Sequence, residues 1–281
     1  MQGAGAYDAV VLDLDGTLVA DDGCVRPSVA DALARARGRG VGVMLATGRS
    51  ALGTAPVASE LDLELPCVVF NGGGLWEARS NRWLEERLLS NRSVDRTFAL
   101  AREHGLYMVV MVAGRKYTTP PRNEVEERGL VGLDGLEVVA WEALPREMVM
   151  RISVFSAEHG TSAELAALVD QAVAQPLYLT DFPLAWLANH RESPLQVVDV
   201  QPPSRGKGEA VRYLVEEHGL DPARIVAVGD ATNDIPMFEA AGLGVAMGNA
   251  MPEAKAHAQR VIGDCNGDAL AELIDELFPV G

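Results

Sequence analysis

The chain contains little cysteine, and its cysteines are scattered. Among 281 residues there are three, Cys24, Cys67 and Cys265, with no CxxC pair. An odd number of widely separated cysteines argues against a disulfide framework and against a structural zinc site. The composition favours a reducing compartment, and we expect a cytoplasmic protein.

Long hydrophobic runs are also missing. The longest apolar stretches, such as 108–113, are far too short to cross a bilayer. The first residues, MQGAGAYDAVV, lack the basic segment with which a signal peptide begins. We therefore expect no association with a membrane.

Basic residues are outnumbered. Lysine and arginine together number 24 against 40 aspartates and glutamates, which gives a net charge of −16. This charge repels phosphate backbones, so we expect no nucleic-acid partner. A small phosphorylated ligand remains possible, because one metal ion or one lysine can reverse the sign of the field locally.

Short apolar segments alternate with helical segments near both ends of the chain. Residues 10–14, 41–46, 66–70 and 225–228 are almost continuously apolar, and 27–39 carries its apolar side chains on one helical face. Strands that are buried on both faces and separated by helices are typical of a parallel sheet. The sequence therefore predicts an α/β fold, a Rossmann-like doubly wound parallel sheet.

A segment of different texture interrupts this pattern. A chain of 281 residues is long for one domain, and its middle has two clear strand candidates, 107–112 and 148–155, among helical segments. None of its loops repeats the strand-then-carboxylate pattern of the flanking regions. We predict a core of residues 1–82 and 191–281, with an inserted α/β cap domain of residues 83–190.

Carboxylates follow two of the predicted strands. Asp13 and Asp15 end the first strand, and Asp230 and Asp234 follow the strand at 225–229. Because ligands of an open parallel sheet bind beyond the carboxyl ends of its strands, we expect these two acidic loops to face each other. So many carboxylates need a compensating cation, and oxygen ligands favour Mg²⁺. Taken alone, the second pair could also cap the helix that follows.

Neutral and positive groups complete the predicted site. Thr47 follows the strand at 41–46, and Gly48 lets backbone amides approach a ligand closely. Lys207, at a predicted helix start, supplies a positive charge that can bind a phosphoryl oxygen. Arg49 could line the site or pair with a surface carboxylate.

These residue types fit phosphoryl transfer, in which catalysis consists mainly of positioning and of neutralising charge. Asp13 would attack phosphorus and form an aspartyl-phosphate. Asp15 would protonate the leaving oxygen and then take a proton from the water that hydrolyses the intermediate.

Four motifs carry a resemblance to a known family. DLDGTL (13–18), ATGR (46–49), the lysine of SRGKG (204–208) and GDATNDIPMF (229–238) resemble, in order and spacing, the motifs of the haloacid dehalogenase (HAD) superfamily. The large insert resembles the class II, IIB-like, cap of the Cof-type sugar-phosphate phosphatases. The insert is entered after a glycine cluster at 71–74, where the family often has Asn-Gly-Ala.

The resemblance implies a role for each motif residue. Asp13 is the expected nucleophile and a Mg²⁺ ligand, and Asp15 is the expected general acid/base, with its backbone carbonyl on the metal. The other contacts that it implies are Thr47, Lys207 and Asn233 for the phosphate or substrate, and Asp230 and Asp234 for the metal. Gly48 and Arg49, beside Thr47, are further candidates for phosphate or substrate binding from their position in the chain.

Taken together, these features predict a HAD-type phosphoric monoester hydrolase. We expect Mg²⁺ as its cofactor and a small phosphorylated molecule, a sugar phosphate, as its substrate. Two alternatives stay open. A phosphomutase would use the same aspartyl-phosphate and return the phosphoryl group to the substrate, whereas a regulatory module would bind phosphate or metal without turnover.

Overall fold

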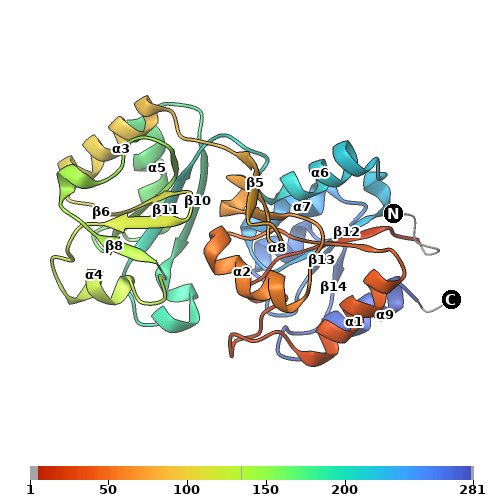
Figure 1. Ribbon diagram of the computed structural model, residues 1–281. Coiled ribbons are helices and arrows are strands. Elements are labelled where there is room, and N and C mark those ends of the chain that lie inside the picture. Colours follow the sequence, from red (N-terminus) through yellow and green to blue (C-terminus); the bar gives the residue numbers. More distant parts are fainter. Residues whose placement is uncertain (1–5, 134, 280–281) are drawn as a thin grey trace. The chain divides into compact units, whose positions relative to one another are not determined.

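The computed structural model describes residues 6–133 and 135–279. The chain divides into two compact units (Figure 1), one formed by the residues up to Glu85 together with those from Arg205 onward, the other by Glu86–Ser204. Within the described residues, no helix combines the length and apolar character needed to span a membrane.

The first unit is built on a five-stranded parallel sheet. Its strands lie in the order β14 (Arg260–Val261), β13 (Leu243–Ala246), β12 (Ile225–Gly229), β1 (Ala9–Leu12) and β2 (Gly42–Leu45). Every residue of β1, β2 and β12 is buried, which explains why these segments are continuously apolar. The predicted parallel α/β sheet is confirmed.

Helices connect these strands. The predicted helix at 27–39 is α1 (Pro27–Gly38), which begins with its proline in the first turn and buries one apolar face. It packs beside α9 (Ala269–Leu277), as Figure 1 shows. The remaining α-helices described in this unit are α2 (Ala51–Glu60), α6 (Glu209–His218), α7 (Ile235–Ala240) and α8 (Pro252–His257).

A small second sheet follows α2 in the first unit. Its strands are β3 (Cys67–Val69), β4 (Gly74–Glu77) and β5 (Arg82–Glu86), and β3 runs antiparallel to β4. A single turn, η1 (Phe70–Gly72), joins the first two strands. The predicted strand at 66–70 therefore ends sooner than expected, in this turn.

The second unit is a six-stranded mixed sheet with helices α3 (Asn91–His104) and α5 (Ser162–Val173) packed on its apolar core. Neighbouring strands run antiparallel except for the last pair, which is parallel. In spatial order the strands are β10 (Tyr178–Pro183), β11 (Gln196–Gln201), β9 (Val149–Ser156), β6 (Tyr107–Val112), β7 (Arg115–Thr118) and β8 (Leu136–Val138), and the unit also contains the short helix α4 (Glu124–Gly129).

The unit boundaries differ from those predicted. The sequence placed 196–200 in the core, but β11 pairs with β9 and β10 in the sheet of the second unit. The second boundary therefore falls after Ser204, not after residue 190, and the first falls after Glu85, not after residue 82. The apolar residues of a strand do not indicate which sheet the strand joins, because strand pairing depends on partners far away in sequence.

Candidate active site

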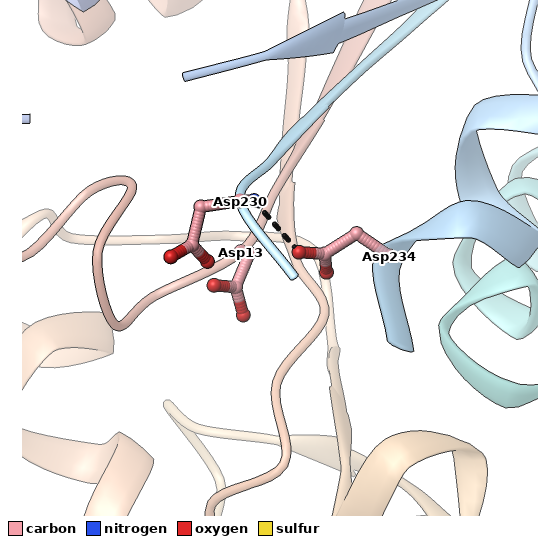
Figure 2. Close-up of side chains that lie close together, drawn as sticks. All are labelled: Asp13, Asp230 and Asp234. Atoms are coloured by element: carbon pink, nitrogen blue, oxygen red, sulfur yellow. Dashed lines mark hydrogen bonds between the residues drawn. The ribbon is translucent and has the colours of Figure 1, made fainter. Parts of the chain in front are cut away.

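Two loops that are far apart in the sequence meet at the carboxyl ends of β1 and β12. These strands are parallel neighbours, so Asp13 and Asp230 leave the sheet side by side. The Asp13 N–H donates to the Val228 carbonyl at 3.0 Å, which fixes the start of the first loop. Figure 2 shows the carboxyl groups of both aspartates next to that of Asp234. One carboxylate oxygen from each of the three lies within 4.8 Å of the others.

Asp234 shapes the second loop. Its side chain is fully buried, and its Oδ2 accepts the N–H groups of Asp230 at 2.8 Å and Ala231 at 2.9 Å. The first of these bonds is the dashed line in Figure 2. Because these bonds hold the turn closed, Asp234 fixes the position from which Asp230 reaches the cluster.

Lys207 lies among the carboxylates. It comes from the turn η5 (Gly206–Gly208) directly before α6, and its side chain is 1% exposed. The ammonium donates to Asp13 Oδ1 and to Asp234 Oδ1, both at 2.6 Å. These short, charge-assisted bonds tie the β1 loop to the β12 loop.

Burial dominates the electrostatics of this cluster. It raises the pKa of Asp13 to about 7, because Lys207 only partly offsets the desolvation and the neighbouring carboxylates add to it. Burial, with the charges of Asp13 and Asp234, raises the pKa of Asp230 to about 9. For Lys207, burial acts to lower the pKa, but its two carboxylate partners outweigh it and raise the pKa.

The charges of the cluster fit a divalent cation. Three ionised carboxylates, Asp13, Asp230 and Asp234, face one ammonium, so the ionised cluster has an excess of two negative charges. Hard carboxylate oxygens are the ligands that Mg²⁺ takes in proteins. A bound Mg²⁺ would supply the two missing positive charges and lower the raised carboxyl pKa values.

Gly16 gives Asp230 room beside the first loop. Its φ of +76° lies in the left-handed region, which favours glycine. A Cβ atom at this position would lie 2.3 Å from Asp230 Oδ2. The glycine of the DLDGTL motif therefore serves both the turn and the space that the Asp230 carboxylate occupies.

Asp15 points toward Arg49. The Arg49 guanidinium donates from Nε to Asp15 Oδ2 at 2.9 Å and from Nη2 to Asp15 Oδ1, which forms a two-pronged ion pair. The side chain of Asp15 is 56% exposed, in contrast to the buried Asp13. Arg49 is thus paired with a carboxylate, and because this partner is the predicted acid/base, Arg49 lies beside the predicted site.

The remaining predicted contacts lie in the adjoining loops. Thr47 is buried after β2, and its hydroxyl accepts the N–H of Arg49 at 3.1 Å. Asn233, in the turn η7 (Thr232–Asp234), donates from Nδ2 to Asn71 Oδ1 at 3.1 Å. The contacts of all these groups with phosphate, and of the Asp15 carbonyl with metal, stay predictions.

Asn71 is the residue that sequence reasoning missed. It was treated only as part of the glycine cluster at 71–74, yet it is buried and bonded to Asn233. An asparagine just after an apolar strand and before glycines was the available signal, because this residue type tolerates left-handed backbone.

Comparison with known proteins identifies the family. The family model for haloacid dehalogenase-like hydrolases matches residues 10–274. Pyridoxal phosphate phosphatase YbhA of Escherichia coli (strain K12) is 30% identical over 276 residues, which cover 94% of this chain and 96% of that protein. The solved phosphatase BT1666 of Bacteroides thetaiotaomicron has a TM-score of 0.81 at 22% identity and covers 99% of this chain and 97% of its own. The HAD subclass IIB sugar phosphatase BT4131 has a TM-score of 0.78 at 19% identity, and the match covers 96% of this chain and 98% of that chain.

The chain therefore belongs to the haloacid dehalogenase-like hydrolases. It is a phosphatase of the Cof-type branch, a phosphoric monoester hydrolase, as its four motifs and its insert predicted. The two solved structures share its fold.

Proposed function

We propose that the chain hydrolyses a small phosphomonoester with the help of Mg²⁺, through an aspartyl-phosphate formed on Asp13. The observation that carries this proposal is the meeting of Asp13, Asp230 and Asp234 around the ammonium of Lys207, at the carboxyl end of a parallel sheet. A carboxylate is thereby held as a nucleophile beside groups that can neutralise a phosphate.

In the first half-reaction, a carboxylate oxygen of Asp13 bonds to phosphorus while the bond from phosphorus to the leaving oxygen breaks. Lys207 orients Asp13 through its bond to Oδ1. Of the three ammonium N–H bonds, two are given to carboxylates among the described residues, and the third can bind a phosphoryl oxygen. Asp15, paired with Arg49 at rest, takes up a proton when that pair opens and passes it to the leaving oxygen.

In the second half-reaction, a water oxygen bonds to phosphorus and the bond from phosphorus to Asp13 breaks. Asp15 is a carboxylate at this stage and takes the proton that the water gives up. Inorganic phosphate leaves, Asp13 is again a free carboxylate, and Asp15 releases the proton to solvent as its ion pair with Arg49 forms again. The position of Asp15, exposed beside a buried Asp13, suits a group that must exchange protons.

The metal is proposed to be held chiefly by Asp13 and Asp230. Asp234 would support the metal indirectly, since both of its oxygens already accept hydrogen bonds, one from Lys207 and the other from the loop of Asp230. When bound, Mg²⁺ neutralises charge on the transferring phosphoryl group. The backbone carbonyl of Asp15 is the further ligand that the family resemblance implies.

The proposed substrate class is a small soluble phosphomonoester. A sugar phosphate is the first candidate, from the likeness of the motifs and the insert to the Cof-type enzymes. Pyridoxal phosphate is the second, because the relative that is 30% identical is named a pyridoxal phosphate phosphatase.

Phosphate release from a panel tests the function. Sugar phosphates, polyol phosphates, nucleotides and pyridoxal phosphate are each offered with Mg²⁺ and with EDTA. We expect release with Mg²⁺ and none with EDTA. Turnover only with a bisphosphate activator would point instead to a phosphomutase. No phosphate release from any compound of the panel, or from an aryl phosphate, would overturn the proposal.

Two matched variants test the roles of the aspartates, with 4-nitrophenyl phosphate as substrate. Its leaving group departs as the anion, so Asp15→Asn should still release a burst of about one nitrophenolate per enzyme and then stall. Asp13→Asn should release none. A burst from Asp13→Asn would contradict the assignment of the nucleophile.

A further inference from the structure

We propose that Asn71 is a positioning residue of this phosphatase, which fixes the Asn233 amide and holds the loop after β2 against the loop after β12. The inference rests on the proposed function, because it matters to turnover only if these loops bind the substrate. It starts from a feature of the backbone next to β3.

Two consecutive residues of the turn after β3 adopt left-handed backbone. Phe70 has φ +53° and Asn71 has φ +50° with ψ +44°. This conformation costs free energy for any residue other than glycine, and for phenylalanine more than for asparagine. A strained pair of this kind persists only where the surroundings impose it, and such pairs cluster at functional sites.

The strained turn is bonded to the loop that contains Thr47. The Phe70 N–H donates to the Arg49 carbonyl and the Asn71 N–H to the Thr47 carbonyl, each at 2.9 Å. The Thr47 N–H in turn donates to the Val68 carbonyl at 2.9 Å. These three backbone bonds fix the predicted phosphate-binding loop on the end of β3.

The side chain of Asn71 extends the connection to the second loop. Its Oδ1 accepts the Asn233 Nδ2 at 3.1 Å. The same amide lies against Gly48, where a Cβ atom would be 3.1 Å from Asn71 Oδ1 and 3.2 Å from Asn71 Nδ2. Gly48 thus provides the close approach that lets Asn71 reach Asn233.

The hydrogen bond to Asn71 fixes the orientation of the Asn233 amide and leaves its Oδ1 as the atom that can accept a bond from a ligand. With Nδ2 given to Asn71, Asn233 Oδ1 is buried and has no hydrogen-bond partner among the described residues. A buried acceptor of this kind is costly unless a donor reaches it. Asn71 therefore presents Asn233 to a ligand in one orientation, which is the contribution of a positioning residue.

The test removes the amide and keeps the backbone. Asn71→Gly retains the left-handed conformation without strain, so a loss of activity reports on the side chain. Asn81→Gly is the matched control, since Asn81 has the same φ of +50° and its amide bonds to Trp76. We expect kcat/KM of Asn71→Gly to fall about 10- to 100-fold, with a thermal midpoint no lower than that of the control variant.

A double-mutant cycle distinguishes a positioning role, in which Asn71 acts through Asn233, from a purely structural role of Asn71. If Asn71 acts through Asn233, Asn71→Gly should add nothing to the loss caused by Asn233→Ala. Additive losses, or Asn71→Gly within about threefold of the unmodified enzyme, would overturn the inference. Absence of turnover in the unmodified enzyme would overturn the proposed function instead, so the two failures are distinct.

Discussion

Replacing Lys207 by methionine should destabilise the fold in a way that depends on pH. The substitution keeps most of the side-chain volume and removes the charge that holds Asp13 and Asp234, each at 2.6 Å and almost fully buried. Removing one partner of a buried ion pair costs about 3–5 kcal/mol, because the other charge stays buried without compensation. We expect this loss in the free energy of unfolding at pH 8 without metal.

The loss should shrink at pH 5.5. Asp13, with its pKa raised to about 7, already carries a proton there, so Asp234 is the carboxylate left without the lysine. The loss in the free energy of unfolding should therefore be smaller at pH 5.5 than at pH 8, because one of the two carboxylates that Lys207 holds is uncharged there.

Urea unfolding followed by circular dichroism measures this difference. The unmodified protein and each variant are unfolded at pH 5.5 and pH 8 in EDTA, and the urea midpoints are converted to free energies of unfolding. Lys255→Met is the control, because Lys255 lies in the same unit and its recorded bond, at 2.6 Å, is to the Gly248 carbonyl. Equal losses for Lys207→Met at both pH values, or a loss at pH 8 no larger than that of the control, would refute the reasoning.

Two further predictions concern the carboxylate cluster. Because burial raises the pKa values of Asp13 and Asp230, the metal-free fold holds protons that the unfolded chain releases, and it loses stability as pH rises from 3.8 toward about 7 for Asp13 and about 9 for Asp230. Mg²⁺ must displace these protons, so it should raise the thermal midpoint more at pH 8.5 than at pH 6, and a larger gain at pH 6 would contradict this. Gly16→Ala should abolish Mg²⁺-dependent turnover, because its Cβ atom would lie 2.3 Å from Asp230 Oδ2. Gly23→Ala is the control, since Gly23 has φ +82° and open space around it, so this variant has the backbone strain alone and should stay active. Equal activity of the two variants would count against the steric clash with Asp230.

The sequence was sufficient for the sheet and for much of the site. Strands buried on both faces are continuously apolar, so β1 and β12 could be recognised locally, and the aspartates that follow them stood out. Because parallel strands end at the same edge of a sheet, the position of Asp13 and Asp230 directly after such strands was enough to predict that they would lie at one edge, and the structure shows that they meet there.

The second unit was predicted less well. Four of its six strands were missed or misplaced, since short strands such as β7 and β8 have little apolar periodicity of their own. Asp199, on β11, pairs with Arg151 on the neighbouring strand β9 at 3.2 Å. A buried ion pair of this kind is visible only when both strands are in place.

The amino-acid sequence by itself determined which residues stand at the strand ends and which chemistry they can perform, because periodicity and residue type are local properties. The tertiary structure decided which groups touch: Lys207 bonds to Asp234 as well as Asp13, Arg49 pairs with Asp15, and a left-handed Asn71 reaches Asn233. These contacts join loops up to 194 residues apart, so they follow from packing and not from any local pattern.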